Sequence, residues 1–499
     1  MGIIIRQSLK GTIVNYVGAF IGFIATMFVS TKFLTPEEVG LTRVMIETAT
    51  ILSSFMALGI GASGMRFFPF FKTNQNSYNN GFLFYLLLFP VVGTIVFGLI
   101  YISLRIPIMH YFEDESPLFN RFFYYVIPLA IGFVFTVAFE TYANNLMRIV
   151  IPKIIREIAL RLMNIVVILL YFWGYFTLPQ FIGATVSIYG IMALLNGIYI
   201  TSMGKFSLKH DFSYIEKPLK KEAMSYTGFL LLSSIGASLV TKVDVFMISG
   251  MLSLDHSGIY SVAMYMAAII EIPNRSLIAI SSPIAAQAIK DNNTNKAQEL
   301  FQKVSLNQLL VSSLIFCFLW INIDNVYYFM PKSEIYSTGK YVVLFIGISK
   351  IFDTISGFAG ILLQYSKYYY YSLLFMFFLS FLTIGLNLTF IPIYAISGAA
   401  FATACTFVIY NCLMLAFVKW KLKLHPFSVN MLKILVIIAA LLLLNFYALP
   451  KLENPLVDSL YRTSVLAVIT GLSVFFWNVS EDMTLLIKSF IRRDKISSL

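Results

Sequence analysis

The chain has 499 residues, of which 59% are hydrophobic and only 12% charged, and its formal net charge is +12. Soluble globular proteins carry about 25% charged residues, and a chain this apolar cannot bury its surface in a core surrounded by water. The composition therefore excludes a soluble protein and predicts one that faces lipid.

Uncharged stretches of about 20 residues, long enough to cross a bilayer core of ~30 Å, recur along the whole chain. The stretches do not alternate polar and apolar residues as the strands of outer-membrane barrels do. We therefore expect an all-α polytopic membrane protein, and no removable signal peptide, because the first apolar run lacks a small-residue cleavage site. We predict fourteen transmembrane helices, at residues 12–34, 41–65, 81–104, 122–147, 157–177, 180–203, 224–250, 257–286, 303–322, 338–364, 367–391, 394–418, 428–447 and 460–479.

The distribution of basic residues predicts the orientation. Most of the 36 lysines and arginines fall in every second connection, in a set that includes both termini, and such connections lie in the cytoplasm. The positive charge thus reports topology and contact with anionic lipid head groups rather than nucleic-acid binding. The three cysteines and four histidines have no metal-binding or redox spacing, so we expect neither a metal site nor a cofactor.

One short pattern, which we call the hinge, occurs twice. FLTPEEVGLTRVM at 33–45 and MLSLDHSGIYSVA at 251–263 each place an apolar pair, a hydroxyl residue, an acidic turn and a glycine between apolar runs. Gly183-Ala184 likewise recurs as Gly398-Ala399, at nearly the same offset. We interpret the repeats as an internal duplication of six helices, which predicts two parallel six-helix bundles related by a pseudo-two-fold axis along the membrane normal, plus two C-terminal helices. The expected domains are an N-terminal lobe at 1–203, a cytoplasmic linker at 204–222, a C-terminal lobe at 223–420, and helices thirteen and fourteen with a cytoplasmic tail at 421–499.

Charged residues also lie inside the predicted helices, where each costs at least ~2.5 kcal/mol by insertion scales. Spacing puts Glu271 and Arg275 on one helical face, and Lys350 and Asp353 on one face of another helix. Lys242 and Asp244 are two residues apart, so their side chains point in different directions and cannot pair with each other. We expect one of them to have a partner on another helix. Either such pairs neutralise each other so that the helices insert, or they line a wet cavity between the lobes. The full set is the cations Arg43, Lys242, Arg275 and Lys350, the acids Glu47, Glu140, Asp244, Glu271 and Asp353, and Pro273, which would kink helix eight as a hinge or as a bend tolerated by packing.

Two segments carry a resemblance to a known family. LTPEEVG at 34–40 and LNLTFIPIYAISGAAFATA at 386–404 resemble the Wzx-type oligosaccharide flippases of the multidrug/oligosaccharidyl-lipid/polysaccharide (MOP) exporter superfamily, although Leu254 stands in the second hinge where the first has Pro36. The resemblance implies a V-shaped central cavity that opens alternately to each side of the bacterial cytoplasmic (inner) membrane. The implied substrate is an undecaprenyl-pyrophosphate-linked sugar repeat unit, moved to the outer leaflet for lipopolysaccharide O-antigen or similar surface polysaccharide. A polysaccharide polymerase and a chain-length regulator are the implied protein partners.

On this interpretation the charged set has two roles. The cations Arg275, Lys242, Lys350 and Arg43 would bind the pyrophosphate, because arginine grips phosphate oxygens with two donors and lysine acts as a point charge. The acids would line the cavity or couple transport to H⁺ or Na⁺, with Glu140, Glu271 and Asp353 as the coupling candidates.

Other functions stay open. A membrane glycosyltransferase or polymerase would need a sizeable extramembrane region for its acceptor and catalytic acids, and the longest outer connections are short. The chain also has no phosphate-binding Walker loop, so we expect a carrier rather than an enzyme. A multidrug antiporter and a peptidoglycan-precursor (lipid II) flippase remain as alternatives, because the cations and acids in the helices nearly balance.

Overall fold

The computed structural model describes residues 2–71, 81–209 and 217–480. Within these ranges it contains helices and turns but no strand, as an all-α protein requires. Part of the predicted linker, 210–216, and most of the predicted tail, 481–499, lie outside the described residues.

Helices make up most of both halves of the chain. The first half contains α1 (Gly2–Ile24), the π-helical turn η1 (Ala25–Ser30), α2 (Thr31–Phe33), α3 (Pro36–Met56), α4 (Ile60–Phe71), α5 (Phe82–Ser103), α6 (Arg105–Glu113), α7 (Pro117–Arg121), the 3₁₀ turn η3 (Phe123–Tyr125), α8 (Val126–Asn145), α9 (Val150–Ile154), the π-helical turn η4 (Ile155–Ala159), α10 (Leu160–Phe172), α11 (Leu178–Ser202) and α12 (Lys217–Met251). The second half contains α13 (Leu254–Ala268), the 3₁₀ turn η5 (Ile269–Glu271), α14 (Ile272–Lys290), α15 (Thr294–Ile321), α16 (Ile323–Phe329), α17 (Ser333–Tyr336), the 3₁₀ turn η6 (Ser337–Gly339), α18 (Lys340–Tyr365), α19 (Tyr370–Leu422), α20 (Val429–Tyr447) and α21 (Pro455–Phe476).

Among the described residues, 10 helices are long and apolar enough to cross a membrane, and a bent pair spanning α13 and α14 would make 11. One of them, α19, is two helices joined at a kink, because Ala395 has non-helical dihedral angles (φ 50, ψ −134). The predicted spans 367–391 and 394–418 meet at this kink. The predicted span 41–65 is interrupted by a turn at 57–59, and the helix in the predicted span 157–177 ends at residue 172. Neither is among these helices, so the count of fourteen stays a prediction.

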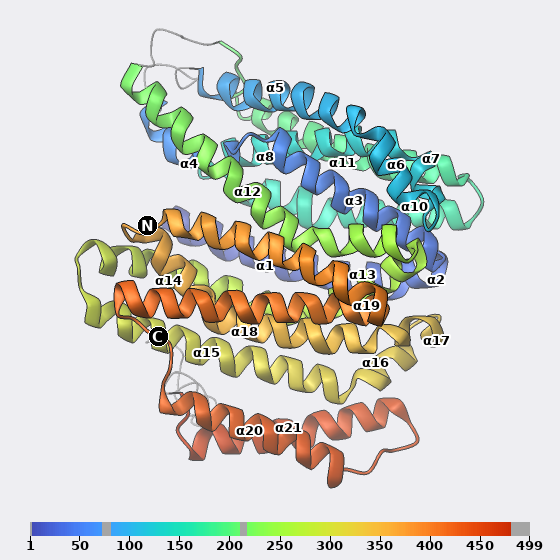
Figure 1. Ribbon diagram of the computed structural model, residues 1–499, viewed down its shortest axis with the longest axis vertical. Coiled ribbons are helices and arrows are strands. Elements are labelled where there is room, and N and C mark those ends of the chain that lie inside the picture. The colour runs from blue at the N-terminus through green and yellow to red at the C-terminus, as the bar shows by residue number, and fades with distance from the viewer. Residues whose placement is uncertain (1, 72–80, 210–216, 481–499) are drawn as a thin grey trace. The chain divides into compact units, whose positions relative to one another are not determined.

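The chain forms two compact units. Unit 1 comprises residues 1–262 and 387–396, and unit 2 comprises 263–386 and 397–499. Within unit 1, α3 packs against α8 and α12, and α8 packs against α11 (Figure 1). Helix α12, which the sequence assigns to the second lobe, lies in unit 1 because it packs along α3 and α4. The lobe boundaries drawn from the sequence stay a prediction.

The two copies of the repeated hinge pack against each other within unit 1. A Cβ atom on Gly40 would lie 1.8 Å from the Leu254 carbonyl oxygen, and a Cβ atom on Gly258 would lie 2.2 Å from the Pro36 carbonyl oxygen. Each glycine therefore faces the carbonyl of the residue four positions before the other glycine. A local two-fold relation between the copies produces this reciprocity, and only the absence of both side chains permits the approach.

The starts of the two hinge helices are also capped alike. The Glu38 N–H donates to the Thr35 hydroxyl at 3.2 Å, and the His256 N–H donates to the Ser253 hydroxyl at 3.2 Å. Glu38 completes a capping box by accepting from the Thr35 N–H at 2.8 Å, which satisfies two of the donors that a helix start leaves unpaired. Both helices therefore begin with a fixed first turn.

Long apolar side chains cover the outside of several helices. On α5, Val91, Ile95 and Leu99 follow one another at helical spacing and are all exposed. On α20, Leu432, Leu435 and Leu443 are exposed in the same way. Exposed apolar surface of this extent would aggregate in water, and it is the expected surface of a helix in lipid.

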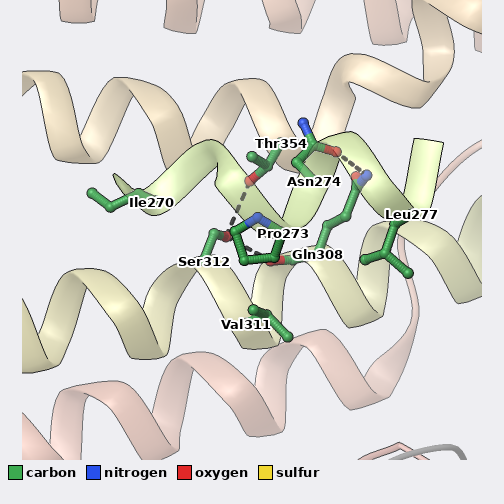
Figure 2. A pocket seen from close by; sticks show the side chains of 8 residues that line it. All are labelled: Ile270, Pro273, Asn274, Leu277, Gln308, Val311, Ser312 and Thr354. Atoms are coloured by element: carbon green, nitrogen blue, oxygen red, sulfur yellow. Dashed lines mark hydrogen bonds between the residues drawn. The ribbon is translucent and has the colours of Figure 1, made fainter. Parts of the chain in front are cut away.

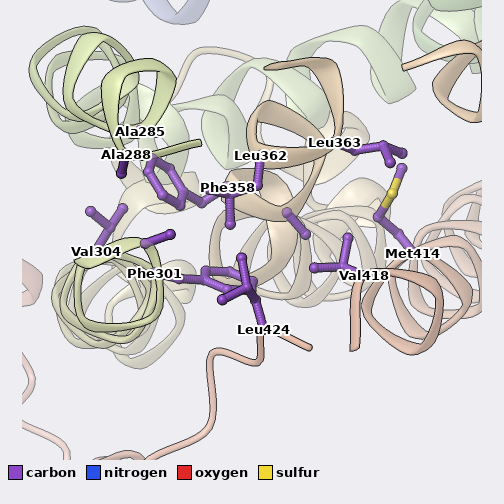
Figure 3. Close-up of a cluster of buried hydrophobic side chains, with 12 residues drawn as sticks. Ala285, Ala288, Phe301, Val304, Phe358, Leu362, Leu363, Met414, Val418 and Leu424 are labelled. Atoms are coloured by element: carbon purple, nitrogen blue, oxygen red, sulfur yellow. The ribbon is translucent and has the colours of Figure 1, made fainter. Parts of the chain in front are cut away.

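Unit 2 has its own hydrophobic core. The side chains of Phe301 on α15 and Phe358 on α18 are fully buried, and their ring centroids lie 6.0 Å apart (Figure 3). Leu362 and Val418 are buried in the same cluster. The core joins α14, α15, α18 and the end of α19.

A buried ionic network fastens the C-terminal hairpin within unit 2. Arg462 Nε donates to both carboxylate oxygens of Asp458 at 2.9 Å, and the two side chains are only 8% and 2% exposed. Asp458 also accepts from the Asn325 amide at 2.7 Å and from the Leu452 N–H at 2.9 Å, while Arg462 donates to Asn445 at 2.6 Å. With its charges paired and hydrogen-bonded, the network ties α21 to α16 and to the end of α20.

Candidate functional site

Lys242 and Asp244 make separate contacts in unit 1. Lys242 Nζ on α12 lies 2.8 Å from Glu47 Oε2 on α3, and the two side chains are 33% and 13% exposed. Asp244, which is buried, accepts hydrogen bonds from the Tyr260 hydroxyl at 2.7 Å and from the Asn387 amide at 2.7 Å. The structure thus brings two of the predicted site residues, Lys242 and Glu47, together across two helices, and places Asp244 in a different polar contact.

Arg43 lies on the same helix as Glu47 and faces the π-helical turn of the first span. Its Nη2 donates to Thr26 Oγ1 at 3.5 Å, and the charges of both Arg43 and Glu47 act on the Tyr189 hydroxyl of α11. Arg43 is half-buried. Arg43 therefore links α3 to the first span, and Glu47 lies one turn further along α3.

The second group of predicted site residues lies in unit 2. Lys350 Nζ donates to Glu271 Oε2 at 2.8 Å, with the side chains 20% and 27% exposed. The charge of Arg275, an exposed residue one turn further on, also acts on Glu271. Asp353 lies near Asn411 and within range of the charges of Lys350 and Glu271. Four predicted site residues are therefore brought together.

The ion pair in this group differs from the one the spacing indicated. The sequence paired Glu271 with Arg275 and Lys350 with Asp353 within single helices, whereas the 2.8 Å contact joins Glu271 to Lys350 on another helix. Spacing rules see only neighbours on one helix. The helix also breaks at this point: the 3₁₀ turn η5 ends at Glu271, and Pro273 lies in the first turn of α14.

Glu140 belongs to a network that the sequence did not indicate. Its Oε2 atom accepts from Arg156 Nη1 at 2.7 Å. Arg156 and Arg161 both reach Glu157, at 3.3 and 2.8 Å. Both arginines lie near a connection that the charge distribution predicts to be cytoplasmic, and the π-helical turn beside them has no sequence signal.

A further group of buried polar side chains surrounds a small pocket in unit 2, beside Pro273 (Figure 2). The Gln308 amide donates to Asn274 Oδ1, and the Thr354 hydroxyl donates to Ser312 Oγ at 3.0 Å. The space between them leaves no room for a water molecule. These contacts satisfy the Gln308 amide and the Thr354 hydroxyl inside an apolar bundle, whereas Gln308 Oε1 is buried without a hydrogen-bond partner among the described residues. Neutral polar residues were not among the predicted site residues, because only charges are conspicuous in an apolar sequence.

Within the described residues, no group of three or more histidine, cysteine, aspartate or glutamate side chains is placed to hold a metal ion. The described residues do contain ion pairs between helices. Lys242–Glu47, Lys350–Glu271 and Arg156–Glu140 each join a cation to a carboxylate on a different helix, and the three cations keep part of their surface exposed. Such an arrangement can bind an anion by exchanging the carboxylate for the ligand.

The fold resembles those of solved membrane proteins. The lipid II flippase MurJ in an inward closed conformation matches with a TM-score of 0.69 at 14% sequence identity, over 97% of this chain and 99% of that chain. An inward-facing multidrug resistance MATE family transporter of the MOP superfamily matches with a TM-score of 0.59 at 12% identity, over 84% and 98% of the two chains. The fold is thus that of the MOP superfamily, and the protein is a multi-pass membrane protein.

The family follows from the sequence match. Residues 6–282, more than half of the chain, match the polysaccharide biosynthesis protein family, and the chain belongs to that family. No curated protein sequence matches the chain. The resemblance drawn from LTPEEVG and from the helix pattern is therefore confirmed at the level of family and fold.

Proposed function

We propose that this protein is a flippase that moves undecaprenyl-pyrophosphate-linked oligosaccharides from the inner to the outer leaflet of the bacterial cytoplasmic membrane. The product would feed the synthesis of a surface polysaccharide such as lipopolysaccharide O-antigen. Membership of the polysaccharide biosynthesis family and the MOP fold support a carrier rather than an enzyme. A polymerase and a chain-length regulator would act on the delivered sugar. In the membrane, both termini of the chain would lie on the cytoplasmic side.

The observation that supports the proposal is the partial exposure of the cations in the predicted membrane spans. Lys242 is 33% exposed and Lys350 is 20% exposed, each beside a carboxylate on another helix, and Arg275 is exposed. A cation kept only to neutralise an acid can be enclosed with it, because a low dielectric strengthens their attraction and so offsets part of the cost of removing both charges from water. A partly exposed pair in an apolar protein instead offers its cation to an anionic ligand. Pyrophosphate is such a ligand, and it carries two or more negative charges.

Alternating access then follows from exchange of partners. In the structure Glu47 and Glu271 hold Lys242 and Lys350 in place. A bound head group takes over part of each lysine's interaction, so the contacts between helices α3 and α12, and between η5 and α18, weaken when substrate binds. A ligand shifts an equilibrium only through such differential contacts. The freed carboxylates, with Asp353 and Glu140, are the groups through which H⁺ or Na⁺ would couple to transport.

A second candidate function is lipid II transport. The structure of the lipid II flippase MurJ covers 97% of this chain, more than the 84% covered by the multidrug transporter, and the lipid II head group is also a pyrophosphate-linked sugar. The same cations would serve it. The multidrug alternative has less support, because paired cations and acids leave no surplus of acid for a cationic drug.

Reconstituted vesicles test the proposal. The purified protein is placed in liposomes containing an undecaprenyl-pyrophosphate oligosaccharide, lipid II or neither, and the outward movement of each lipid is followed by its accessibility to an added lectin or hydrolase. We expect transport of the oligosaccharide lipid above the rate in protein-free liposomes. Transport of lipid II alone would replace the first candidate by the second, and transport of neither would refute the flippase proposal. Imposed H⁺ and Na⁺ gradients in the same vesicles decide whether coupling is obligatory.

A further inference from the structure

The π-helical turn η4 gathers two arginines on one side of its helix. The Leu160 N–H bonds to the Ile155 carbonyl, five residues earlier. In a regular α-helix, residues five apart point about 140° away from each other, and the extra residue in an i→i+5 turn reduces this angle. Arg156 and Arg161 are five apart, and both contact the carboxylate of Glu157, at 3.3 and 2.8 Å.

The two arginines are held by acids but keep donors available. Arg156 is 47% exposed although it is paired with Glu140, which is 12% exposed. Nη1 of Arg161 is buried and has no hydrogen-bond partner among the described residues. The Oε1 atom of Glu140 is likewise buried without a hydrogen-bond partner among those residues. The cluster therefore contains guanidinium donors and a carboxylate acceptor that its own contacts leave unused.

The cluster lies towards the end of unit 1 that the charge distribution predicts to be cytoplasmic. Glu140 is five residues from the end of α8, and Arg156 is six residues from the start of α9, so both lie roughly 8–9 Å along their helices at 1.5 Å per residue. Arg161 lies about 16 Å along. The helix α8 and the turn η4 both pack on α11, so the Arg156–Glu140 pair joins two segments that share this neighbour. Lys153, whose stem packs on Gly11 of α1, adds a third cation at the same end.

We propose that Arg156 and Arg161 form a pyrophosphate-binding site, occupied in the unloaded protein by Glu140 and Glu157, that receives the substrate head group as it leaves the inner leaflet. This assignment rests on the proposed flippase function and names residues beyond the central cations. Two guanidinium groups on one face match the oxygens of a pyrophosphate, because each can donate two parallel hydrogen bonds. The three cations outnumber the two acids, and binding requires only that Arg156 exchange Glu140 for a phosphate oxygen.

If a phosphate oxygen replaces Glu140 on Arg156, then neutralising the arginine and neutralising the acid should change affinity in opposite directions. In Arg156→Gln the site loses a charged donor, and affinity for the pyrophosphate head group falls about tenfold or more, the loss expected for a charge-assisted hydrogen bond. In Glu140→Gln the competing carboxylate loses its charge while its shape is kept, and affinity rises several-fold. A purely structural ion pair predicts that both variants destabilise the protein and that neither raises affinity.

Binding is measured on the full chain in lipid nanodiscs by native mass spectrometry. The arms contain undecaprenyl pyrophosphate, inorganic pyrophosphate, or only the phospholipids of the disc, so that a lipid-linked head group is distinguished from free pyrophosphate and from membrane phosphate. Lys340→Gln and Asp324→Asn are the matched controls, since they alter an ion pair of similar length, 2.6 Å, in unit 2. Opposite shifts for Arg156→Gln and Glu140→Gln, with no shift in the controls, support the site.

Equal affinity in the wild-type protein and Arg156→Gln would overturn the site and leave the flippase function standing, provided that the wild type transports the oligosaccharide lipid. Preference for disc phospholipid over undecaprenyl pyrophosphate would also overturn it. A wild type that neither binds nor transports any pyrophosphate-linked lipid refutes the function together with the site.

Discussion

Replacing either hinge glycine by alanine should force α3 and α13 apart. The added Cβ atom would stand 1.8 Å from the Leu254 carbonyl oxygen in Gly40→Ala and 2.2 Å from the Pro36 carbonyl oxygen in Gly258→Ala, where ordinary contact begins at 3.4 Å. The obstacle in both cases is backbone, which cannot rotate away as a side chain would. The helices must therefore separate by roughly 1.2–1.6 Å to restore ordinary contact, and overpacking of this kind costs about 1–3 kcal/mol. A cost of that size lowers the population of the packed hinge roughly 5–150-fold relative to any separated state.

Cysteine cross-linking measures that population. The pair Glu37→Cys and Asp255→Cys is suited to it, because these are equivalent positions of the two hinge copies and the native charges act on one another. In a background with the three native cysteines replaced, we expect rapid oxidative cross-linking in the parent and much slower cross-linking after Gly40→Ala or Gly258→Ala.

A matched control is Gly190→Ala on α11, where an added Cβ meets nothing within 4 Å; it should cross-link like the parent. If Gly258→Ala cross-links as fast as the parent and unfolds at the same temperature, then the hinge contact is looser than the structure shows and the argument from close approach is wrong.

Two further predictions concern charged residues. Arg275→Ala should leave the amount of protein in the membrane unchanged but abolish surface polysaccharide in cells that depend on this chain. The control Lys367→Ala, which removes a cation outside the predicted cavity, should have no effect. A normal level of surface glycan in both variants would show that Arg275 does not bind substrate. Arg462→Ala should destabilise unit 2 by about 3–5 kcal/mol, because it leaves the buried Asp458 without its cation. Lys340→Ala, at a solvent-exposed pair, should cost only about 0–1 kcal/mol. Equal melting temperatures of the two variants in detergent would contradict the burial of the Asp458–Arg462 pair.

The sequence predicts the architecture well because membrane insertion imposes a simple rule. Every apolar run of sufficient length must become a helix, so the runs at 81–104 and 428–447 locate α5 and α20 within a few residues. This success follows from a feature that is local in the sequence and strong in energy. The repeated hinge indicated a duplication, which stays a prediction; that its two copies meet at Gly40 and Gly258 is seen only in the structure.

The partners of the charged residues were predicted less well. Spacing along one helix identifies which side chains share a face, but the contacts Lys242–Glu47 and Lys350–Glu271 join helices that are far apart in the sequence. The gathering of Arg156 and Arg161 depends on a single π-helical turn, whose i→i+5 bond changes the angular relation of all residues beyond it. No propensity of the residues 155–159 marks such a turn. Inter-helix geometry of this kind is decided by packing, which one sequence does not reveal.

The capped starts of α3 and α13 limit how the hinge can move. Fraying of the first turn would relieve a clash at Gly40 or Gly258 cheaply, but the N–H groups of Glu38 and His256 are held by Thr35 and Ser253 at 3.2 Å in both copies, and losing such a cap costs about 1 kcal/mol. Separation at the glycine contact, by contrast, breaks van der Waals contact between two backbones and no hydrogen bond between them. Movement between α3 and α13 is therefore cheaper as a rigid displacement of intact helices than as local unwinding. Removing a cap, as in Ser253→Ala, should accordingly lower the cost of Gly258→Ala, a non-additivity that a double-mutant cycle on cross-linking rates would detect.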